Sequence, residues 1–500
     1  MMRVLRSLAK DSAIYGAANA GTGLLALLLV PLYTHNLTVS EFGSYSLMVT
    51  IYSLLFVLTD CGLTNSIARY YFNEGQIGDS ITAAAYRKSL VTTAFLITAC
   101  LALLLGIVCY GSADFVSRHA FGTPTYGPLL RIVGVTLLFR GLTIAPMVYL
   151  RVTERAIAYG MLSLLQVALF LGFTLLSVLV LGWGVAGILY SQLLATAIWA
   201  IGAVVAIAPD LVRRPQISIA KDLLKFGLPL LPAGPLMWIV DLSDRYLIER
   251  YVSTQEVGLY SLGYRFGQVM IILVTAMTLA WPPLSYRILG EADPEAIYSR
   301  ITSLYLAGAG LVWLVVSLFG HEMVVLLSPE EFHAAAIYIA PVGFGYLLYG
   351  LYVLSVTGLG VAKKSGPISW VTLVAAVVNV GLNVWLIPRF GALVAAYTTV
   401  IAYAILTGGC LMISQRFYPI PYRYREWTVV LGGMIVLCGV PALLPTMSRL
   451  ASTGLNLGIL AMYVGLIFVS GVLCREEIRT FTRALSGVAP RTPPVRTTSP

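Results

Sequence analysis

The chain has 500 residues, of which 58% are hydrophobic and only 11% are charged, and it carries a formal net charge of +10. This composition, with a mean hydropathy of +0.86, excludes an ordinary soluble protein of this length. The basic residues do not form a patch interleaved with aromatic residues, so the positive charge does not indicate a nucleic-acid partner.

Fourteen long apolar segments follow one another along the chain. Each has the roughly 20 apolar residues that an α-helix needs to cross a hydrocarbon core about 30 Å thick. Helix is the expected structure, because lipid offers no hydrogen bonds to the backbone. The sequence therefore predicts an all-α, polytopic membrane protein with about 14 transmembrane helices. The segments lie at 12–34, 41–64, 90–110, 127–150, 156–181, 184–208, 223–245, 256–283, 301–319, 334–358, 366–387, 391–414, 427–446 and 453–474.

The lysines and arginines fall almost entirely into every second gap between these segments. Of the 32, 24 lie on the side that holds the N-terminus, five on the opposite side and three within predicted helices. Such a bias is typical of the cytoplasmic loops of membrane proteins. It predicts that both termini are cytoplasmic. The basic start of the chain is expected to remain as the first helix rather than to be cleaved.

Two short motifs occur twice, in the same order. LAKDSAIYG at 8–16 recurs as IAKDLLKFG at 219–227, and SEFGSYS at 40–46 recurs as QEVGLYS at 255–261. Six predicted helices separate the copies, so both halves would enter the membrane in the same direction. Transporters place their substrate at the interface of such parallel repeats. Coincidence between apolar sequences is the alternative explanation.

The repeat predicts two parallel six-helix lobes followed by two C-terminal helices. No loop is long enough for an extramembrane domain, so the function should lie within the bundle. The C-terminal tail lacks the apolar content to fold and is expected to be largely disordered. The predicted units are a cytoplasmic N-terminal segment at 1–11, an N-lobe at 12–210, a cytoplasmic linker at 211–222, a C-lobe at 223–415, helices 13 and 14 at 416–475, and a cytoplasmic tail at 476–500.

Two runs of sequence resemble a known family. These are SAIYGAANAGTGLLALLLVPLYTHNLTVSEFGSYSLMVTIYSLL, which starts at residue 12, and DRYLIERYVSTQEVGLYSLGYRFGQVM, which starts at residue 244 and is followed by WPPLSYR. They are similar to the oligosaccharide flippases, the polysaccharide transporter branch of the multidrug/oligosaccharidyl-lipid/polysaccharide exporter superfamily. In the arrangement of its predicted helices, the resemblance covers residues 5–475.

The resemblance implies a fold and a function. The two lobes would enclose a V-shaped cavity that opens alternately to either side of the bacterial inner membrane. The implied substrate is an undecaprenyl-diphosphate-linked oligosaccharide, moved from the inner to the outer leaflet for O-antigen, capsule or exopolysaccharide assembly. A monomer in the lipid bilayer is expected, and polysaccharide polymerase machinery is a candidate partner.

Two arginines lie deep within predicted helices. A charge at the middle of a helix costs about 2.5–3.5 kcal/mol on insertion scales and should therefore face a cavity or a partner. Arg265 lies about 13 Å into the eighth helix and Arg140 about 20 Å into the fourth. A guanidinium can donate paired hydrogen bonds to diphosphate oxygens, so Arg265 and Arg140 are predicted to bind substrate. For Arg265, pairing with an acid of the seventh helix is the alternative. Arg131 should lie on the opposite helix face from Arg140, at the membrane surface.

Three acidic residues also lie in predicted helices. They are Asp60 in the second helix and Asp241 and Asp244 in the seventh. For Asp244 and its neighbour Arg245, local ion pairing is the simpler interpretation. Asp60, Asp241 and Asp244 are candidates for binding a coupling H⁺ or Na⁺, and Asp241 is also a candidate substrate contact. No other cofactor is expected.

The seventh segment contains Pro229, Pro232 and Pro235. Prolines remove backbone donors and break a helix, and broken helices in transporters commonly form gates. We therefore predict a hinge for alternating access at these prolines, with a static kink as the alternative. Asn65 is a candidate contact to sugar hydroxyls, although interhelical hydrogen bonding is the commoner role for such residues. The same two interpretations apply to Asn19, Gln166, Gln192, Asn379 and Asn383.

Two other classes of function were weighed. No catalytic motif is present, the six cysteines have no CxxC spacing and the four histidines form no cluster, so neither an enzyme nor a metal site is expected. A cation-coupled multidrug exporter of the same superfamily is the main alternative. Such exporters should end near twelve helices and often carry an acid in the first helix, whereas this chain has two further segments after residue 425 and no acid in its first segment after Asp11.

Overall fold

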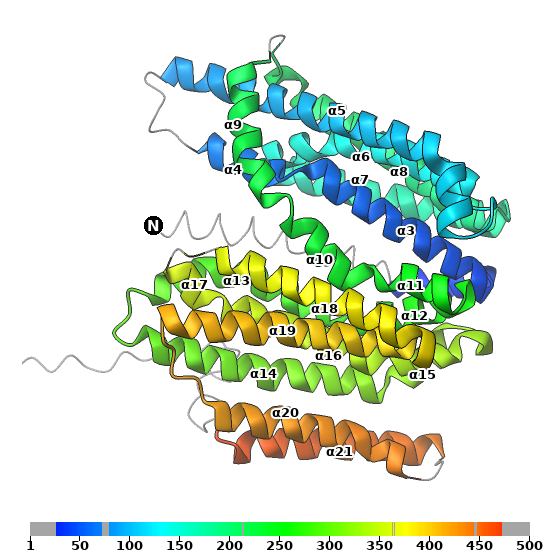
Figure 1. The fold of residues 1–500 in the computed structure, drawn as a ribbon, viewed down its shortest axis with the longest axis vertical. Helices are drawn as coiled ribbons and strands as arrows, with labels where there is room; N and C mark the ends of the chain where they lie inside the picture. Colours follow the sequence, from blue (N-terminus) through cyan, green and yellow to red (C-terminus); the bar gives the residue numbers. More distant parts are fainter. Residues whose placement is uncertain are drawn as a thin grey trace, which may run out of the picture.

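A computed structural model describes residues 27–72, 80–212, 215–362, 364, 366–444 and 448–472. Within these ranges every regular element is a helix. Figure 1 shows two bundles, one above the other, and a separate pair of helices at the lower edge. The all-α class predicted from the apolar segments is confirmed.

The first bundle is built from five long helices that pack side by side, with two short helices at one end (Figure 1). A short helix precedes them, a π-helical turn extends the fourth long helix, and a 3₁₀ turn ends the fifth. In chain order these elements are α2 (Val30–Asn36), α3 (Val39–Asp60), α4 (Leu63–Tyr71), α5 (Ser80–Ala120), α6 (Gly127–Val152), α7 (Ala156–Leu175), η2 (Leu176–Val180), α8 (Gly184–Ile207), η3 (Ala208–Asp210) and α9 (Ile217–Gly227).

The second bundle contains the helices from α10 to α19, and the last two helices pack on α14 at its edge (Figure 1). Its elements are η4 (Leu228–Leu230), α10 (Ala233–Leu242), α11 (Asp244–Tyr251), α12 (Thr254–Gly267), α13 (Met270–Ile288), α14 (Pro294–Leu318), α15 (Gly320–Leu327), η5 (Glu330–Tyr338), α16 (Ile339–Ser355), α17 (Thr357–Val361), α18 (Gly366–Phe390) and α19 (Leu393–Phe417). The edge pair is α20 (Tyr424–Gly439) and α21 (Arg449–Val469), joined through η6 (Val440–Leu443).

Among the described residues, eleven helices are long and apolar enough to cross a membrane, and a bent pair of helices makes a twelfth span. These twelve coincide with twelve of the fourteen predicted segments. Of the other two, the segment 12–34 is described only from Leu27 onward, and the segment 223–245 is broken into short helices. The chain is therefore a multi-pass membrane protein, as its sequence predicts.

The break in the seventh segment follows its prolines. Helix α9 ends at Gly227, one 3₁₀ turn contains Pro229, and α10 begins directly after Pro232. The missing N–H groups of these prolines prevent a continuous α-helix. The predicted break is present, while its role as a hinge stays a prediction.

The eighth segment was predicted as one helix, and this is wrong. Helices α12 and α13 are bent by 53° at the break between Gly267 and Met270. At the break the Val269 N–H donates to the Phe266 carbonyl at 3.2 Å, and the Ile271 N–H donates to the Gln268 carbonyl at 2.8 Å. These tighter i to i+3 bonds replace the α-helical pattern and turn the chain. No proline marks this break in the sequence.

The repeated Glu-x-Gly-x-Tyr-Ser motif forms the contact between the bundles. Its two copies begin α3 and α12, which lie side by side. A methyl group at Gly43 would lie 2.0 Å from the Thr254 carbonyl oxygen, and one at Gly258 would lie 2.1 Å from the Val39 carbonyl oxygen. Only glycine lets the two backbones approach this closely. The first motif pair cannot be compared, because residues 8–16 lie outside the described ranges.

The bundles meet at one end and separate toward the other. In Figure 1 they converge on the right, near the α3–α12 contact, and diverge on the left, where α4 and α9 face α13 and α17. The divergent end is the one to which the charge pattern assigns the cytoplasm.

Candidate functional site

Arg265 lies on α12 beside a cavity that both bundles line. The cavity has a volume of about 340 Å³, and the first bundle contributes Tyr45, Gln166 and Gln192 to its wall. The Arg265 guanidinium carbon lies 4.9 Å from the ring centroid of Phe42 and 5.7 Å from that of Tyr45. These aromatic faces stabilise the cation without neutralising it.

Arg140 lies on α6 at a second cavity, which is lined by the first bundle alone. Its guanidinium carbon lies between two aromatic rings, 4.5 Å from the centroid of Phe56 and 4.7 Å from that of Trp199. The cavity again has a volume of about 340 Å³, and its wall includes Arg151 and Ser163.

The two cavities adjoin. Gln166 lines both of them, and Gln192 lines the Arg265 cavity together with a smaller one of about 110 Å³. No aspartate or glutamate is among the described residues that line these three cavities. Within the described ranges, neither Arg140 nor Arg265 forms an ion pair. The result is a set of adjoining cavities whose two arginines have no carboxylate partner among the residues that the structure describes.

The cavities lie at different depths. Thr64, Arg151 and Tyr159 place the Arg140 cavity near the divergent end of the bundles, where α6 ends and α7 begins. Tyr45, near the start of α3, places the Arg265 cavity nearer the end where the bundles meet. A molecule that entered from the divergent end would reach Arg140 before Arg265.

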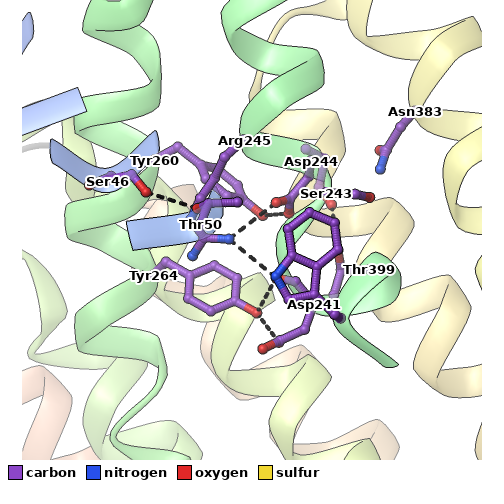
Figure 2. Close-up of polar contacts among 12 residues, drawn as sticks. Ser46, Thr50, Asp241, Ser243, Asp244, Arg245, Tyr260, Tyr264, Asn383 and Thr399 are labelled. Atoms are coloured by element: carbon purple, nitrogen blue, oxygen red, sulfur yellow. Dashed lines mark hydrogen bonds and ion pairs between the residues drawn. The ribbon is translucent and has the colours of Figure 1, made fainter. Parts of the chain in front are cut away.

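Arg245 has a different environment, which Figure 2 shows. Its side chain is buried, and Nη1 donates to Asp244 Oδ1 and to the Asp241 backbone carbonyl, both at 3.2 Å. The hydroxyl of Tyr260 also donates to the Asp244 carboxylate. The local ion pair suggested by the sequence is therefore present. Arg245 is one of the five basic residues that the charge pattern counts in the gaps opposite the N-terminus, and this placement was wrong, because the guanidinium is paired and buried inside the second bundle.

The carboxylate of Asp241 is held by tyrosines from three helices. Its Oδ1 accepts hydrogen bonds from Tyr264, from Tyr346 at 2.9 Å and from Tyr403 at 3.1 Å. Gln268, at the bend between α12 and α13, donates to the Tyr346 hydroxyl at 3.1 Å and also lines the Arg265 cavity. A continuous hydrogen-bonded chain thus leads from that cavity to Asp241.

The other predicted site residues lie apart from this chain. Asp60 accepts hydrogen bonds from the backbone N–H and the hydroxyl of Thr64, and so holds the start of α4. Asn65 is exposed on α4 and is not among the residues that line the three cavities. Ion coupling at Asp60, Asp241 or Asp244, and sugar contact at Asn65, stay predictions.

Of the neutral polar residues in the spans, Gln166 and Gln192 reach cavities, whereas Asn379 and Asn383 do not. The two asparagines are fully buried on α18, where Asn383 donates to Asn379 and accepts from Thr398 of α19. Asn383 fits the interhelical alternative, whereas the hydrogen bond of Asn379 stays within α18.

Most residues of the cavity walls were not predicted, and three of them are instructive. Gln268 follows Arg265 by three positions, so the i,i+3 rule could have found it. Arg151 was assigned to a loop by the charge pattern, although it also lines the Arg140 cavity. Trp199 carried no signal, because a tryptophan in an apolar helix looks the same whether it faces lipid or a cavity.

The structure has two helical bundles with arginine-lined cavities in and between them. Solved structures of membrane transporters share this fold. The lipid II flippase MurJ in an inward closed conformation matches with a TM-score of 0.67 at 12% identity, over 92% of this chain and 100% of that one. An inward-facing multidrug resistance MATE family transporter of the MOP superfamily matches with a TM-score of 0.69 at 14% identity, over 79% and 94%.

Sequence comparisons identify the family. The model of the polysaccharide biosynthesis protein family matches residues 36–286, half of the chain, and the MatE model matches residues 229–385. The chain belongs to the polysaccharide biosynthesis protein family, which confirms the resemblance noted in its sequence. The probable low-salt glycan biosynthesis flippase Agl15 of Haloferax volcanii is 20% identical over 466 residues, or 92% of this chain and 93% of that protein.

Proposed function

We propose that this protein is a flippase that moves a diphosphate-linked oligosaccharide lipid from the inner to the outer leaflet of the bacterial inner membrane, for surface polysaccharide assembly. The observation that carries the proposal is the pair of arginines, Arg265 and Arg140, which line adjoining cavities and lack carboxylate partners in the described part of the chain. A charge without a partner in a membrane-spanning bundle is stabilised when an anion binds.

The chemistry of the substrate fits this space. A diphosphate leaving water must exchange its hydration for hydrogen bonds, and a guanidinium fork supplies two at once. Arg265 faces the cavity that both bundles line, so it is the residue proposed to hold the diphosphate. The lipid tail would stay in the bilayer while the polar headgroup crosses through the cavities.

Alternating access follows from the contact between the repeats. The close approach at Gly43 and Gly258 seals one end of the interface, and the substrate would leave when this contact opens. The break at Pro229 and Pro232, just before the helix that contains Pro235, and the break at Gln268 would absorb the rotation of the two lobes. The chain from Gln268 through Tyr346 to Asp241 would let a coupling H⁺ or Na⁺ at Asp241 respond to the occupancy of the cavity.

A cation-coupled multidrug exporter is the second candidate. The MatE match over residues 229–385 and the fold of the MATE transporters favour it. The electrostatics of the cavities oppose it. A cationic drug would meet two or three guanidinium groups, and the described residues that line the cavities include no acidic side chain.

Translocation in vesicles tests the proposal. The purified protein is reconstituted with a fluorescent undecaprenyl-diphosphate-linked oligosaccharide, and the fraction that reaches the opposite leaflet is measured. Arg265→Ala is expected to reduce the rate about tenfold or more, since it removes a hydrogen-bonding charge worth about 1.5–3 kcal/mol. Arg131→Ala serves as the control, because Arg131 pairs with Asp114 on the surface. Full activity of the Arg265 variant, or efflux of cationic drugs without lipid translocation, would contradict the proposal.

A further inference from the structure

The smallest of the three cavities is a side pocket of the Arg265 cavity. Both cavities have Tyr45, Val49 and Gln192 in their walls. The side pocket lies within the first bundle, where α3, α6 and α8 meet, and has a volume of about 110 Å³. Because a water molecule occupies about 30 Å³ of liquid, this is the space of about three or four waters. The side pocket can therefore hold a small substituent of a sugar, but not a whole sugar ring.

Much of the wall of the side pocket is apolar. Met48, Val133 and Leu189 contribute buried aliphatic side chains. No charged side chain is among the described residues that line the side pocket. A sugar hydroxyl placed against such a wall would lose hydrogen bonds to water without replacing them, whereas a methyl group would gain from leaving water. The wall thus favours an apolar substituent over a hydroxyl.

An amide lies where the side pocket adjoins the larger cavity. Gln192 lines both and is partly exposed. Its carboxamide interacts with the Tyr52 hydroxyl of the same wall. Since a carboxamide has two donors and an acceptor, it can hold a further partner. A substituent that combines an amide with a methyl group, as the acetamido group of an N-acetyl sugar does, would match both the Gln192 amide and the apolar wall.

The side pocket lies close to the proposed position of the diphosphate. Tyr45 lines both cavities, and its ring centroid lies 5.7 Å from the Arg265 guanidinium carbon. A diphosphate at Arg265 would therefore place the first sugar, to which it is bonded, beside the side pocket. In the N-acetyl hexosamines the acetamido group is carried by the ring carbon next to the one that bears the diphosphate. The two groups are then as close in the ligand as the two sites are in the protein.

We propose that the side pocket selects a lipid-linked oligosaccharide whose first sugar carries an acetamido group. The methyl group would lie against Met48, Val133 and Leu189, and the amide would pair with Gln192. This inference rests on the proposed flippase function and names a substrate class for it. Water is the other candidate to fill the side pocket, and exchanging the acetamido group for a hydroxyl distinguishes the two.

Translocation of matched fluorescent lipid-diphosphate trisaccharides in vesicles tests the proposal. Two substrates differ only in the first sugar, which is N-acetylglucosamine or glucose. The wild type is expected to have a kcat/KM on the order of tenfold higher for the acetamido substrate, since burial of one methyl group together with one hydrogen bond has about this effect. A third substrate, with glucose first and N-acetylglucosamine second, should not show this preference.

Val133 is the residue to change, because among the three cavities it lines the side pocket alone. Val133→Leu fills the side pocket and should reduce the preference to about twofold or less. Val133→Ala enlarges it and should raise the kcat/KM for an N-propionyl substrate relative to the N-acetyl one. Val185→Leu is the matched control, because Val185 is also buried on α8 but lines none of these cavities, and it should keep the wild-type preference.

The other outcomes each overturn a defined statement. Equal kcat/KM of the wild type for the two first sugars would reject the side pocket as a specificity site. So would a preference that both Val133 variants leave unchanged, or one that Val185→Leu abolishes as completely as Val133→Leu. Translocation of none of the substrates by the wild type would reject the flippase function itself. If Val133→Leu does not fold, Val133→Ala decides, because it predicts a gain for the larger acyl group.

Discussion

Arg245 and Arg140 are both arginines in membrane-spanning bundles, and their surroundings differ in one decisive respect. Arg245 is 6% exposed and lies 3.2 Å from the carboxylate of Asp244, with a tyrosine hydroxyl completing the acceptor set. Arg140 is half-buried beside a cavity and touches aromatic faces, with no carboxylate partner in the described ranges.

The difference separates structural charges from functional ones. A buried guanidinium with its own carboxylate is already neutralised, and a substrate anion would have to compete with that carboxylate. A guanidinium stacked on aromatic rings keeps its charge, so it is available to an anion that enters the cavity. Burial alone would have pointed to Arg245, whereas a position beside a cavity with no carboxylate partner in the described part of the chain points to Arg140 and Arg265.

The largest expected effect comes from breaking the buried pair. Asp244→Ala should destabilise the protein by about 3–5 kcal/mol, because it leaves the Arg245 charge buried without a partner. Denaturant unfolding in detergent, followed by fluorescence, measures the change. The double variant Asp244→Ala/Arg245→Met is the matched control and should regain most of the loss, since it removes both charges. Equal stability of Asp244→Ala and the wild type would remove the distinction drawn between the two arginines.

A smaller effect on folding is expected at the cavity. Arg140→Ala should change the free energy of unfolding by about 1–2 kcal/mol, because it removes cation–π contacts with Phe56 and Trp199 and leaves no buried charge without a partner. The same unfolding assay measures it beside Asp244→Ala. Loss of stability comparable to that of the Asp244 variant would show that Arg140 is structural and that its cavity position has no bearing on transport.

The smallest effect is expected for Arg131. It lies 2.6 Å from Asp114, but both side chains are well exposed, and such pairs contribute less than about 1 kcal/mol. Arg131→Ala should therefore be close to the wild type in both unfolding and translocation. A tenfold loss of translocation here would mean that removing any positive charge from this bundle impairs transport, so the effects at Arg265 and Arg140 would no longer locate a site.

The sequence anticipated features whose cause is local. Pro229 and Pro232 mark the break that was predicted between α9 and α10, because a missing N–H removes a helical hydrogen bond, while Pro235 lies in the first turn of α10. The cost of a charge in lipid drew attention to Arg265 and Arg140, and both line cavities. The bend at Gln268 was not predicted, because no proline marks it and the hydrogen bond from Gln268 to Tyr346 of α16 joins residues far apart in the sequence.

The membrane location, the all-helical class and the duplicated plan were determined by the sequence alone. The membrane location follows from the transfer free energy of apolar side chains, and the helical class follows from the cost of unpaired backbone groups in lipid. The duplicated plan follows from the recurrence of Glu-x-Gly-x-Tyr-Ser. Tertiary structure alone decided which polar groups meet across helices. The pair of Asp244 with its neighbour Arg245 is local and was predicted, whereas Asp241, three residues away, is held by three tyrosines from other helices, which the sequence did not indicate. Partners from distant helices, like the walls of a cavity, are set by how those helices pack.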